Sequence, residues 1–285
     1  MAVTPEQLAE KVLTIASLPT VYLKLMEITN NPNSTSADIV TLISGDIGFS
    51  VRLMKLVNSA FFGYPSKIDS LSRAVTVIGT KQLQELVLAT SVVDMFKNVP
   101  TELINMELFW KHSIVCGVIA RILANHRREF NAERAFISGL LHDIGRLVIL
   151  MIIPNLTKKT LSIAKAQEHL LFQVETDVAG FTHAAVGGAL LKQWQLPEQV
   201  IYATQYHHSP SVADKFKADV ALIHIADIMA NALHPSSSGE SFVSPLNTAA
   251  WDELGLSVAI LEPMLAEFTQ QYQDTLSIIM PDVAP

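Results

Sequence analysis

Histidines and acids interrupt apolar stretches at widely separated points of the chain. The segment GLLHDIGRLVI, residues 139 to 149, places His142 and Asp143 side by side in an apolar run. Asp227 interrupts VALIHIADIMANAL, which is apolar nearly all round and is therefore expected to be a buried helix. A charge buried without compensation costs several kcal/mol, so we expect such an acid to meet a cation, a hydrogen-bonding partner or a metal.

The nine histidines of the chain differ in their surroundings. His112 and His183 share helical faces with apolar residues three, four and seven positions away, which places both rings on inward stripes. The tandem HHSP places His207 and His208 just before a proline, where side chains can turn into a cleft. Three others stand among polar or loop residues and are expected to be exposed: His126, His169 and His234.

Two interpretations of the inward histidines remain open on spacing alone. A single histidine on an apolar face is more often a core residue with satisfied hydrogen bonds than a ligand. Several imidazoles together with inward carboxylates, however, suit a first-row divalent metal such as iron, manganese or zinc. The combination therefore favours a metal site.

Helical periodicity runs through almost every segment, and no stretch shows the sustained alternation of a strand, so the sequence predicts an all-α chain. Capping boxes mark two helix starts, at Thr4 with Gln7 and at Thr35 with Asp38. Thr80 is expected to cap the helix that starts at KQLQEL. Helices are also expected in LPTVYLKLMEITNNPNS and DIGFSVRLMKLVNSAFFGYPS and near residues 71–79, 105–126, 131–142, 156–178, 182–195, 197–208, 216–233, 246–254 and 257–279.

The best candidate boundary is KNVPTE, around Pro100. It divides the chain into an N-terminal helical subdomain, residues 1–100, and a second one, residues 101–285. Nothing there is long or rich in glycine and serine, so we expect a packed joint and not a flexible linker. The segment HPSSSGESFVSP, residues 234 to 245, is expected to be a surface loop.

Composition excludes several classes of protein. With 49% hydrophobic and 16% charged residues, the chain is too apolar to be disordered. Its net charge of -7 gives no overall attraction for nucleic acid or an anionic membrane. The longest apolar run, LVILMII, is shorter than the roughly 18 residues of a membrane span, and the N-terminus lacks an apolar signal region. We therefore expect a cytoplasmic protein, with the single Cys116 buried as a small hydrophobe.

The order of these residues resembles the HD superfamily of metal-dependent phosphohydrolases, whose signature is a His, a His-Asp doublet and a distant Asp. His112, His142-Asp143 and Asp227 match it, and Arg146 stands where a lysine is common. Over residues 15 to 215 the chain resembles more fully the HDOD family, an HD-related output domain of bacterial signal transduction. The matching segments are LPTVYLKLMEI, DIGFSVRLMKLVNSAFFG and KIDSLSRAVTVIGTKQLQELVLA, with Asp46, Asn58-Ser59-Ala60, Ala74 and Gly79.

The resemblance implies a multi-helix HD-like bundle with the N-terminal helical subdomain packed against it. His183, His207 and His208 resemble the extra ligands of HD-GYP cyclic-dinucleotide phosphodiesterases, which would permit a second ion. The implied metal ligands are His112, His142, Asp143, His183, His207, His208 and Asp227. Two departures count against that activity: no Gly-Tyr-Pro segment follows His208, and Leu108 replaces the glutamate expected one turn before His112.

Two functions follow from the resemblance. The favoured one is a regulatory HDOD protein that binds a divalent metal, with a phosphorylated small molecule or nucleotide and a signalling protein as its expected partners, and with no membrane or nucleic acid among them. The alternative is a metal-dependent phosphohydrolase acting on a nucleotide or cyclic dinucleotide. Asp143 would then orient the nucleophile and Arg146 and Lys111 would hold the phosphate, although both cations could equally be solvated helix charges. His224 is either a support for a ligand or a core residue.

Overall fold

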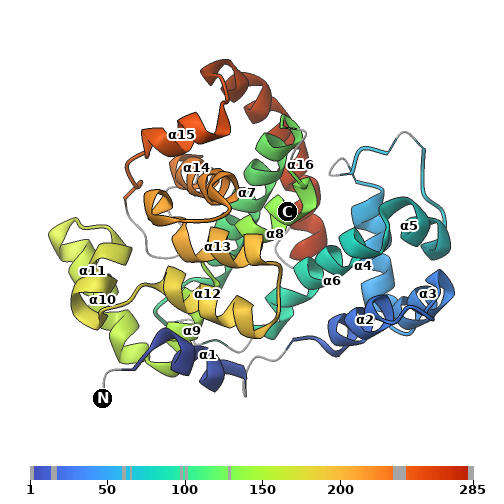
Figure 1. Ribbon diagram of the computed structural model, residues 1–285, viewed down its shortest axis with the longest axis horizontal. Helices are drawn as coiled ribbons and strands as arrows, with labels where there is room; N and C mark the ends of the chain where they lie inside the picture. Colours follow the sequence, from blue (N-terminus) through green and yellow to red (C-terminus); the bar gives the residue numbers. More distant parts are fainter. Residues whose placement is uncertain are drawn as a thin grey trace. The chain divides into compact units, whose positions relative to one another are not determined.

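The computed structural model describes residues 3–13, 18–59, 62–64, 66–96, 99, 102–127, 130–233 and 242–281. Within these ranges every regular element is a helix, which confirms the predicted all-α class (Figure 1). The chain divides into two compact units, one of residues 1–17 and 98–265 and the other of residues 18–97 and 266–285. The boundary expected around Pro100 lies near the division between residues 97 and 98. The N-terminal residues 1–17, however, group with residues 98–265, and the C-terminal residues 266–285 group with residues 18–97. The packing of the two subdomains stays a prediction.

The smaller unit contains α2 (Thr20–Asn30), α3 (Ser36–Ser44), α4 (Ile47–Val57), α5 (Leu71–Ile78), α6 (Thr80–Met95) and most of α16 (Leu261–Ile279). Asp46 caps α4 by accepting a hydrogen bond from Phe49 N at 2.8 Å. Asn58 ends the same helix and donates to the carbonyls of Met54 and Ile68, each at 2.9 Å, while accepting from Ile68 N at 2.8 Å. Asn58 therefore has a structural role here, which is to fix the chain after α4.

The larger unit begins with α1 (Pro5–Leu13) and resumes with α7 (Met106–Asn125), α8 (Ala132–Leu141) and α9 (Ile144–Ile152). It continues with α10 (Pro154–Gln167), α11 (Leu171–Ala179), α12 (His183–Gln193), α13 (Glu198–Tyr206), the short η1 (Pro210–Val212), α14 (Lys217–Leu233), α15 (Thr248–Leu254) and η2 (Val258–Ile260). Its core includes the middle of α7 and most of α8, α9 and α14, since nearly every side chain there is buried.

Glycines bring the central helices of this unit into backbone contact. A Cβ atom on Gly139 would lie 2.6 Å from the Cα of Gly117, so α8 and α7 touch at these residues. A Cβ atom on Gly145 would collide with the carbonyl oxygen of His183 and lie 2.5 Å from the nitrogen of Gly187, so α9 and α12 touch as well. These two close approaches draw together the helices that carry the polar residues of interest.

Most helix signals in the sequence are confirmed, with two corrections. Both capping boxes form, at Thr4 with Gln7 and at Thr35 with Asp38. Thr80, however, does not cap α6 but is its first helical residue, and the residue before it is Gly79. Gly79 has a φ of 83°, which glycine adopts without steric cost, and this turn joins α5 directly to α6. The single helix expected over 156–178 is two helices, because Glu168 takes a left-handed conformation with φ 56° and ends α10.

The remaining expectations fall in different places. Cys116, as predicted, is fully buried, and His126 and His169 are exposed. His234 and most of the expected 234–245 loop lie outside the described residues. Within the described ranges, Ala132–Ile152 is the one stretch long and apolar enough to cross a membrane. However, 89% of its most apolar 18-residue segment is buried inside the protein, as in a core helix.

Candidate metal centre

All seven residues expected to bind metal lie together in the larger unit, in two groups. The first group is His112, His142 and Asp227, and the second group is Asp143, His183, His207 and His208. Within each group, one ligand atom from every residue lies within 4.8 Å of the others. The five histidines of these groups are therefore not isolated core residues, which was one of the two interpretations that the sequence left open.

The first group is built from α7, the end of α8 and α14. His112 Nε2 lies 3.2 Å from Asp227 Oδ1 and 3.3 Å from His142 Nε2. His142 Nε2 lies 3.5 Å from the same carboxylate oxygen. Three potential ligand atoms thus face one another, with His112 in the middle of α7 and Asp227 in the middle of α14, both on the buried faces of their helices.

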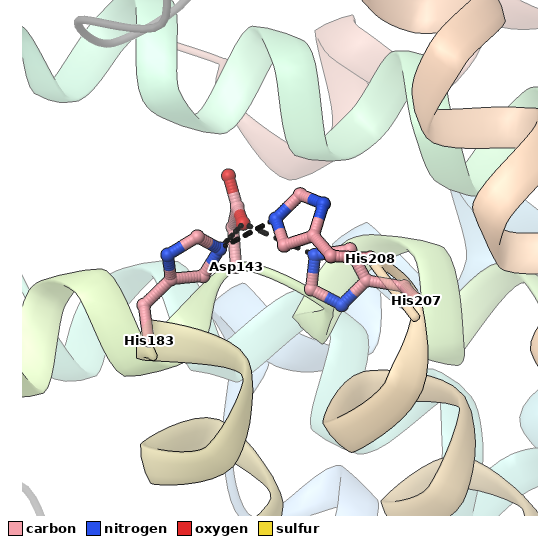
Figure 2. Close-up of side chains that lie close together, drawn as sticks. All are labelled: Asp143, His183, His207 and His208. Atoms are coloured by element: carbon pink, nitrogen blue, oxygen red, sulfur yellow. Dashed lines mark hydrogen bonds and ion pairs between the residues drawn. The ribbon is translucent and has the colours of Figure 1, made fainter. Parts of the chain in front are cut away.

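The second group collects its side chains at helix ends. Figure 2 shows Asp143 with His183 on one side and His207 and His208 on the other. Asp143 Oδ1 lies 3.1 Å from His183 Nε2 and 3.8 Å from His207 Nε2, and His208 Nε2 lies 3.0 Å from His183 Nε2. His183 is the first residue of α12, and the tandem histidines follow the last residue of α13.

Asp143 joins the two groups. It stands with His142 in the turn between α8 and α9, so neighbouring residues of one chain segment serve different groups. Its Oδ1 atom is 3.7 Å from His142 Nε2, in addition to its contacts in the second group. This oxygen is therefore placed to serve an ion in either group, which answers why an acid and an imidazole stand together in an apolar run.

The outer nitrogens of three rings are held by hydrogen bonds. His142 Nδ1 donates to the carbonyl of Gly139 and His207 Nδ1 to that of Thr204, each at 2.7 Å. His183 Nδ1 donates to Glu175 Oε2 at 2.6 Å. In a neutral imidazole this leaves Nε2 as the unprotonated nitrogen, and in all three rings Nε2 faces the group. The rings are thus oriented as metal ligands are.

Buried atoms without partners test whether the site fits a metal. Asp143 Oδ1 and His207 Nε2 are both buried and make no hydrogen bond to any described residue. Such an oxygen and nitrogen cost free energy when removed from water unless something else satisfies them. Imidazole nitrogens and carboxylate oxygens are common ligands of zinc, manganese and iron. The donor set and the unpartnered atoms therefore fit a divalent cation.

The charges in the cluster lead to the same conclusion. Burial opposes the ionisation of Asp143, but His142 and Arg146 hold the pKa of its carboxyl well below its ordinary value. Burial likewise opposes the charge of Asp227, yet hydrogen bonds from His112 and His142 keep its pKa well below the usual range. Although burial disfavours a charged His183, Glu175 and Asp143 raise the pKa of this ring to about 10. The buried acids thus draw positive charge into the cluster.

Two cations were predicted to lie at the site, and their contacts differ. Arg146 is buried, and its Nη1 donates to Asp143 Oδ2 at 3.0 Å, so it lies against the cluster. Lys111 Nζ pairs with Glu107 Oε1 at 2.6 Å, one turn away on α7. A role for either cation in holding a phosphate stays a prediction.

Three supporting residues connect the ligands to the surrounding helices. His224, for which the sequence allowed a supporting role, donates from Nδ1 to the carbonyl of His207 at 2.7 Å. Asn231 donates to Asp227 Oδ1 at 2.8 Å, and Glu175 accepts from His183. Sequence reasoning missed the last two. Asn231 could have been found, because it lies four residues after Asp227 on the same helix, whereas Glu175 lies on a separate helix from its partner.

The fold and the clustered side chains define an all-α protein with a buried His/Asp centre. The profile of the HDOD domain matches residues 15–210, well over half of the chain, and the chain therefore belongs to the HDOD family. An "Uncharacterized protein" of Treponema pallidum (strain Nichols) is 29% identical over 226 residues, which cover 78% of this chain and 43% of that protein. The chain thus spans less than half the length of this relative.

Solved structures share the fold. An HDOD domain protein with unknown function from Geobacter sulfurreducens is similar with a TM-score of 0.75 and 24% identity, over 97% of this chain and 98% of that one. A protein of Shewanella amazonensis SB2B, provisionally named a phosphohydrolase, gives a TM-score of 0.72 and 24% identity, over 95% and 97% of the two chains. At these identities the likeness establishes the fold alone.

Proposed function

We propose that this chain is a cytoplasmic regulatory protein of bacterial signal transduction that holds one or two divalent ions, with iron, manganese or zinc as the candidates. The observation that carries the proposal is the convergence of seven imidazole and carboxylate side chains into two groups that Asp143 joins. Within the second group, Asp143 Oδ1 and His207 Nε2 are buried and make no hydrogen bond to a described residue. His112, His142 and Asp227 would hold one ion, and His183, His207 and His208 the other. Asp143 would contribute to both.

The burial of the cluster favours regulation over catalysis. Six of the seven residues are at most 2% exposed, and His208 is only partly exposed. A phosphate ester could not reach Asp143 without displacement of the helices that cover it. An ion held there would instead tie α7, the α8–α9 turn, α12, α13 and α14 together. Because ligands must lose protons and gather before they bind, metal binding would be coupled to the conformation of this whole unit.

The proposed output is a change in the surface that this unit offers to a signalling protein. Arg146 supports a further proposal, that a phosphorylated small molecule or nucleotide acts as an input. Its guanidinium keeps a fixed positive charge beside Asp143, and such groups pair well with phosphate. Arg146 is itself only 3% exposed, so such a ligand would reach it only when the covering helices move, and its binding would then alter the charge balance of the cluster.

The alternative function is a metal-dependent phosphohydrolase. The observation that favours it is the position of Asp143 between the two groups, with Arg146 against its second oxygen. A bound divalent ion supplies a Lewis acid for a phosphoryl oxygen. In that case Asp143 would orient the groups around the phosphate and Arg146 would bind its negative charge. The absence of a Gly-Tyr-Pro segment and the leucine at position 108 argue against the dimetal phosphodiesterase type.

Metal content tests the proposal. Protein purified without chelator should contain one to two equivalents of iron, manganese or zinc by elemental analysis. Asp143→Asn keeps the shape of the side chain but removes the charge that both groups share, and it should lower the content at least tenfold. Asp252→Asn, an exposed acid on α15, is the matched control and should bind like the wild type. Wild-type protein that contains no metal, and takes up none when it is offered, would contradict the proposal.

A hydrolysis assay separates the two functions. Metal-loaded wild type and Asp143→Asn should show the same background on a panel of nucleotides, cyclic dinucleotides and phosphomonoesters. Turnover by the wild type that Asp143→Asn abolishes would establish the phosphohydrolase and overturn the regulatory assignment. The comparison of the two variants excludes contaminating phosphatases, since these would act equally in both samples.

A further inference from the structure

Helix α11 contacts the second group through two side chains. Glu175 is 5% exposed, although it is an acid in a helix whose polar residues otherwise face solvent. It lies next to Val174, which packs with Leu171 and with Ala164 of α10 in a small core shared by these two helices. An acid held beside such a core requires a partner, and His183 is that partner.

The carboxylate of Glu175 makes two hydrogen bonds to one residue. Its Oε2 atom accepts from the backbone nitrogen of His183 at 2.8 Å and from Nδ1 of the same ring at 2.6 Å. The backbone nitrogen belongs to the first turn of α12, where N–H groups have no partner within the helix, so the first bond helps to fix that helix end. The second bond fixes which ring nitrogen carries the proton.

These two bonds determine the basicity and the orientation of His183 Nε2. When a cation replaces the proton on Nε2, the proton on Nδ1 stays held by an anion, and the ring then offers a more basic Nε2 to the group, 3.1 Å from Asp143 Oδ1. The bond to Nδ1 also holds the ring in this orientation, while the backbone bond fixes the position of the residue that carries it. Glu175 thus acts on the metal centre through His183, without offering a ligand atom itself.

We propose that Glu175 is a positioning residue for the metal centre: through its two hydrogen bonds to His183 it makes metal binding by the second group depend on the docking of α11. This inference rests on the proposed metal-binding function. A second contact from the same helix agrees with it, since the ring of Phe172 stacks on His208 with centroids 4.4 Å apart and planes 13° apart. Two of the four residues of the second group are therefore held by α11.

The experiment is a titration of metal-free full-length protein with Zn²⁺ against a competing chelator. Wild type should bind two equivalents. Glu175→Ala should bind one of them 10–100-fold more weakly and the other unchanged. Glu175→Gln keeps an oxygen that can accept from His183 but lacks the charge, and it should lose about tenfold. Asp177→Asn, an exposed acid on the same helix, should match wild type in both equivalents.

A spectroscopic readout separates positioning from a merely structural role. In Zn²⁺-loaded wild type, long-range ¹H–¹⁵N spectra should show His183 protonated at Nδ1, and the same signal should shift or broaden in Glu175→Ala. If Glu175→Ala loses both equivalents through misfolding, Glu175→Gln decides the question, because it preserves shape and hydrogen bonding.

The outcomes distinguish this inference from the proposed function. Two equivalents in wild type with unchanged affinities in Glu175→Gln and Glu175→Ala would overturn the role of Glu175 and leave the metal site standing. No Zn²⁺ binding in wild type would overturn the metal site, and the inference with it. Selective weakening of one equivalent, with a changed His183 signal, would support both.

Discussion

Asp143 depends on its neighbours to remain charged inside the protein. Its side chain is 1% exposed, and Arg146 lies against one of its oxygens at 3.0 Å. Removing one partner of a buried ion pair leaves the other charge without compensation. Arg146→Met should therefore lower the unfolding free energy of chelator-treated protein by about 3–5 kcal/mol, measured by urea denaturation.

The partly exposed pair of Arg134 and Asp219, at 3.2 Å, offers the matched control. Arg134→Met should cost less than about 1 kcal/mol, because solvent can replace much of the lost interaction. Arg146→Lys retains a charge, so its loss of unfolding free energy should lie between those of Arg146→Met and Arg134→Met. Equal losses in Arg146→Met and Arg134→Met would contradict the idea that Asp143 needs Arg146 as a counter-charge.

At the same scale, the sequence predicted the candidate ligands but only one of their supports, His224. His112, His142 and Asp227 can be recognised because a polar group in an apolar run is unusual. Glu175 gives no such signal, because its sequence neighbourhood, LFQVETD, mixes apolar and polar residues as an amphipathic surface helix does. Its importance arises only when the left-handed residue at 168 and the following turns return α11 towards His183.

At the scale of elements, the close contact of α9 and α12 holds Asp143 near His183. Gly145 makes this contact possible, because a Cβ atom there would collide with the carbonyl of His183 and approach Gly187 N to 2.5 Å. Gly145→Ala must therefore separate the two helices. It should destabilise the protein by about 3 kcal/mol or more in urea denaturation and weaken Zn²⁺ binding by the second group.

Gly48→Ala provides the comparison for this substitution. A Cβ atom there would meet Asp46 Oδ1 at 3.4 Å and Arg52 Nη1 at 3.7 Å, which are ordinary contacts on an exposed part of α4. Its stability should stay within about 1 kcal/mol of wild type, because alanine is the better helix former. A Gly145→Ala protein as stable as Gly48→Ala would show that the helices have room to separate.

Helix positions were largely predictable, and the exceptions have local causes. Periodicity and capping boxes located the long helices, because apolar stripes and cap side chains leave direct signals. The break between α10 and α11 carries neither glycine nor proline. It depends on Glu168 in a left-handed conformation, supported by a bond from the nitrogen of His169 to the carbonyl of Ala164 at 3.1 Å.

At the scale of the whole molecule, the chain ends group in a way that sequence patterns did not indicate. Residues 1–17 belong with residues 98–265, and residues 266–285 with residues 18–97. Within the larger unit, the side-chain amide of Gln193 on α12 donates to the carbonyl of Glu6 on α1 at 3.4 Å. Contacts between residues so far apart in sequence depend on tertiary packing, and the candidate boundary at KNVPTE could not indicate them.

Anomalous X-ray diffraction from crystals of protein purified without chelator tests the central claim most directly. We predict an anomalous peak between His112, His142 and Asp227, and a second among His183, His207 and His208, each within metal-ligand distance of Asp143. Data collected on both sides of the absorption edges would identify the element. Well-ordered side chains at these positions with no anomalous peak, in crystals grown with added Zn²⁺, Mn²⁺ or Fe²⁺, would contradict the account.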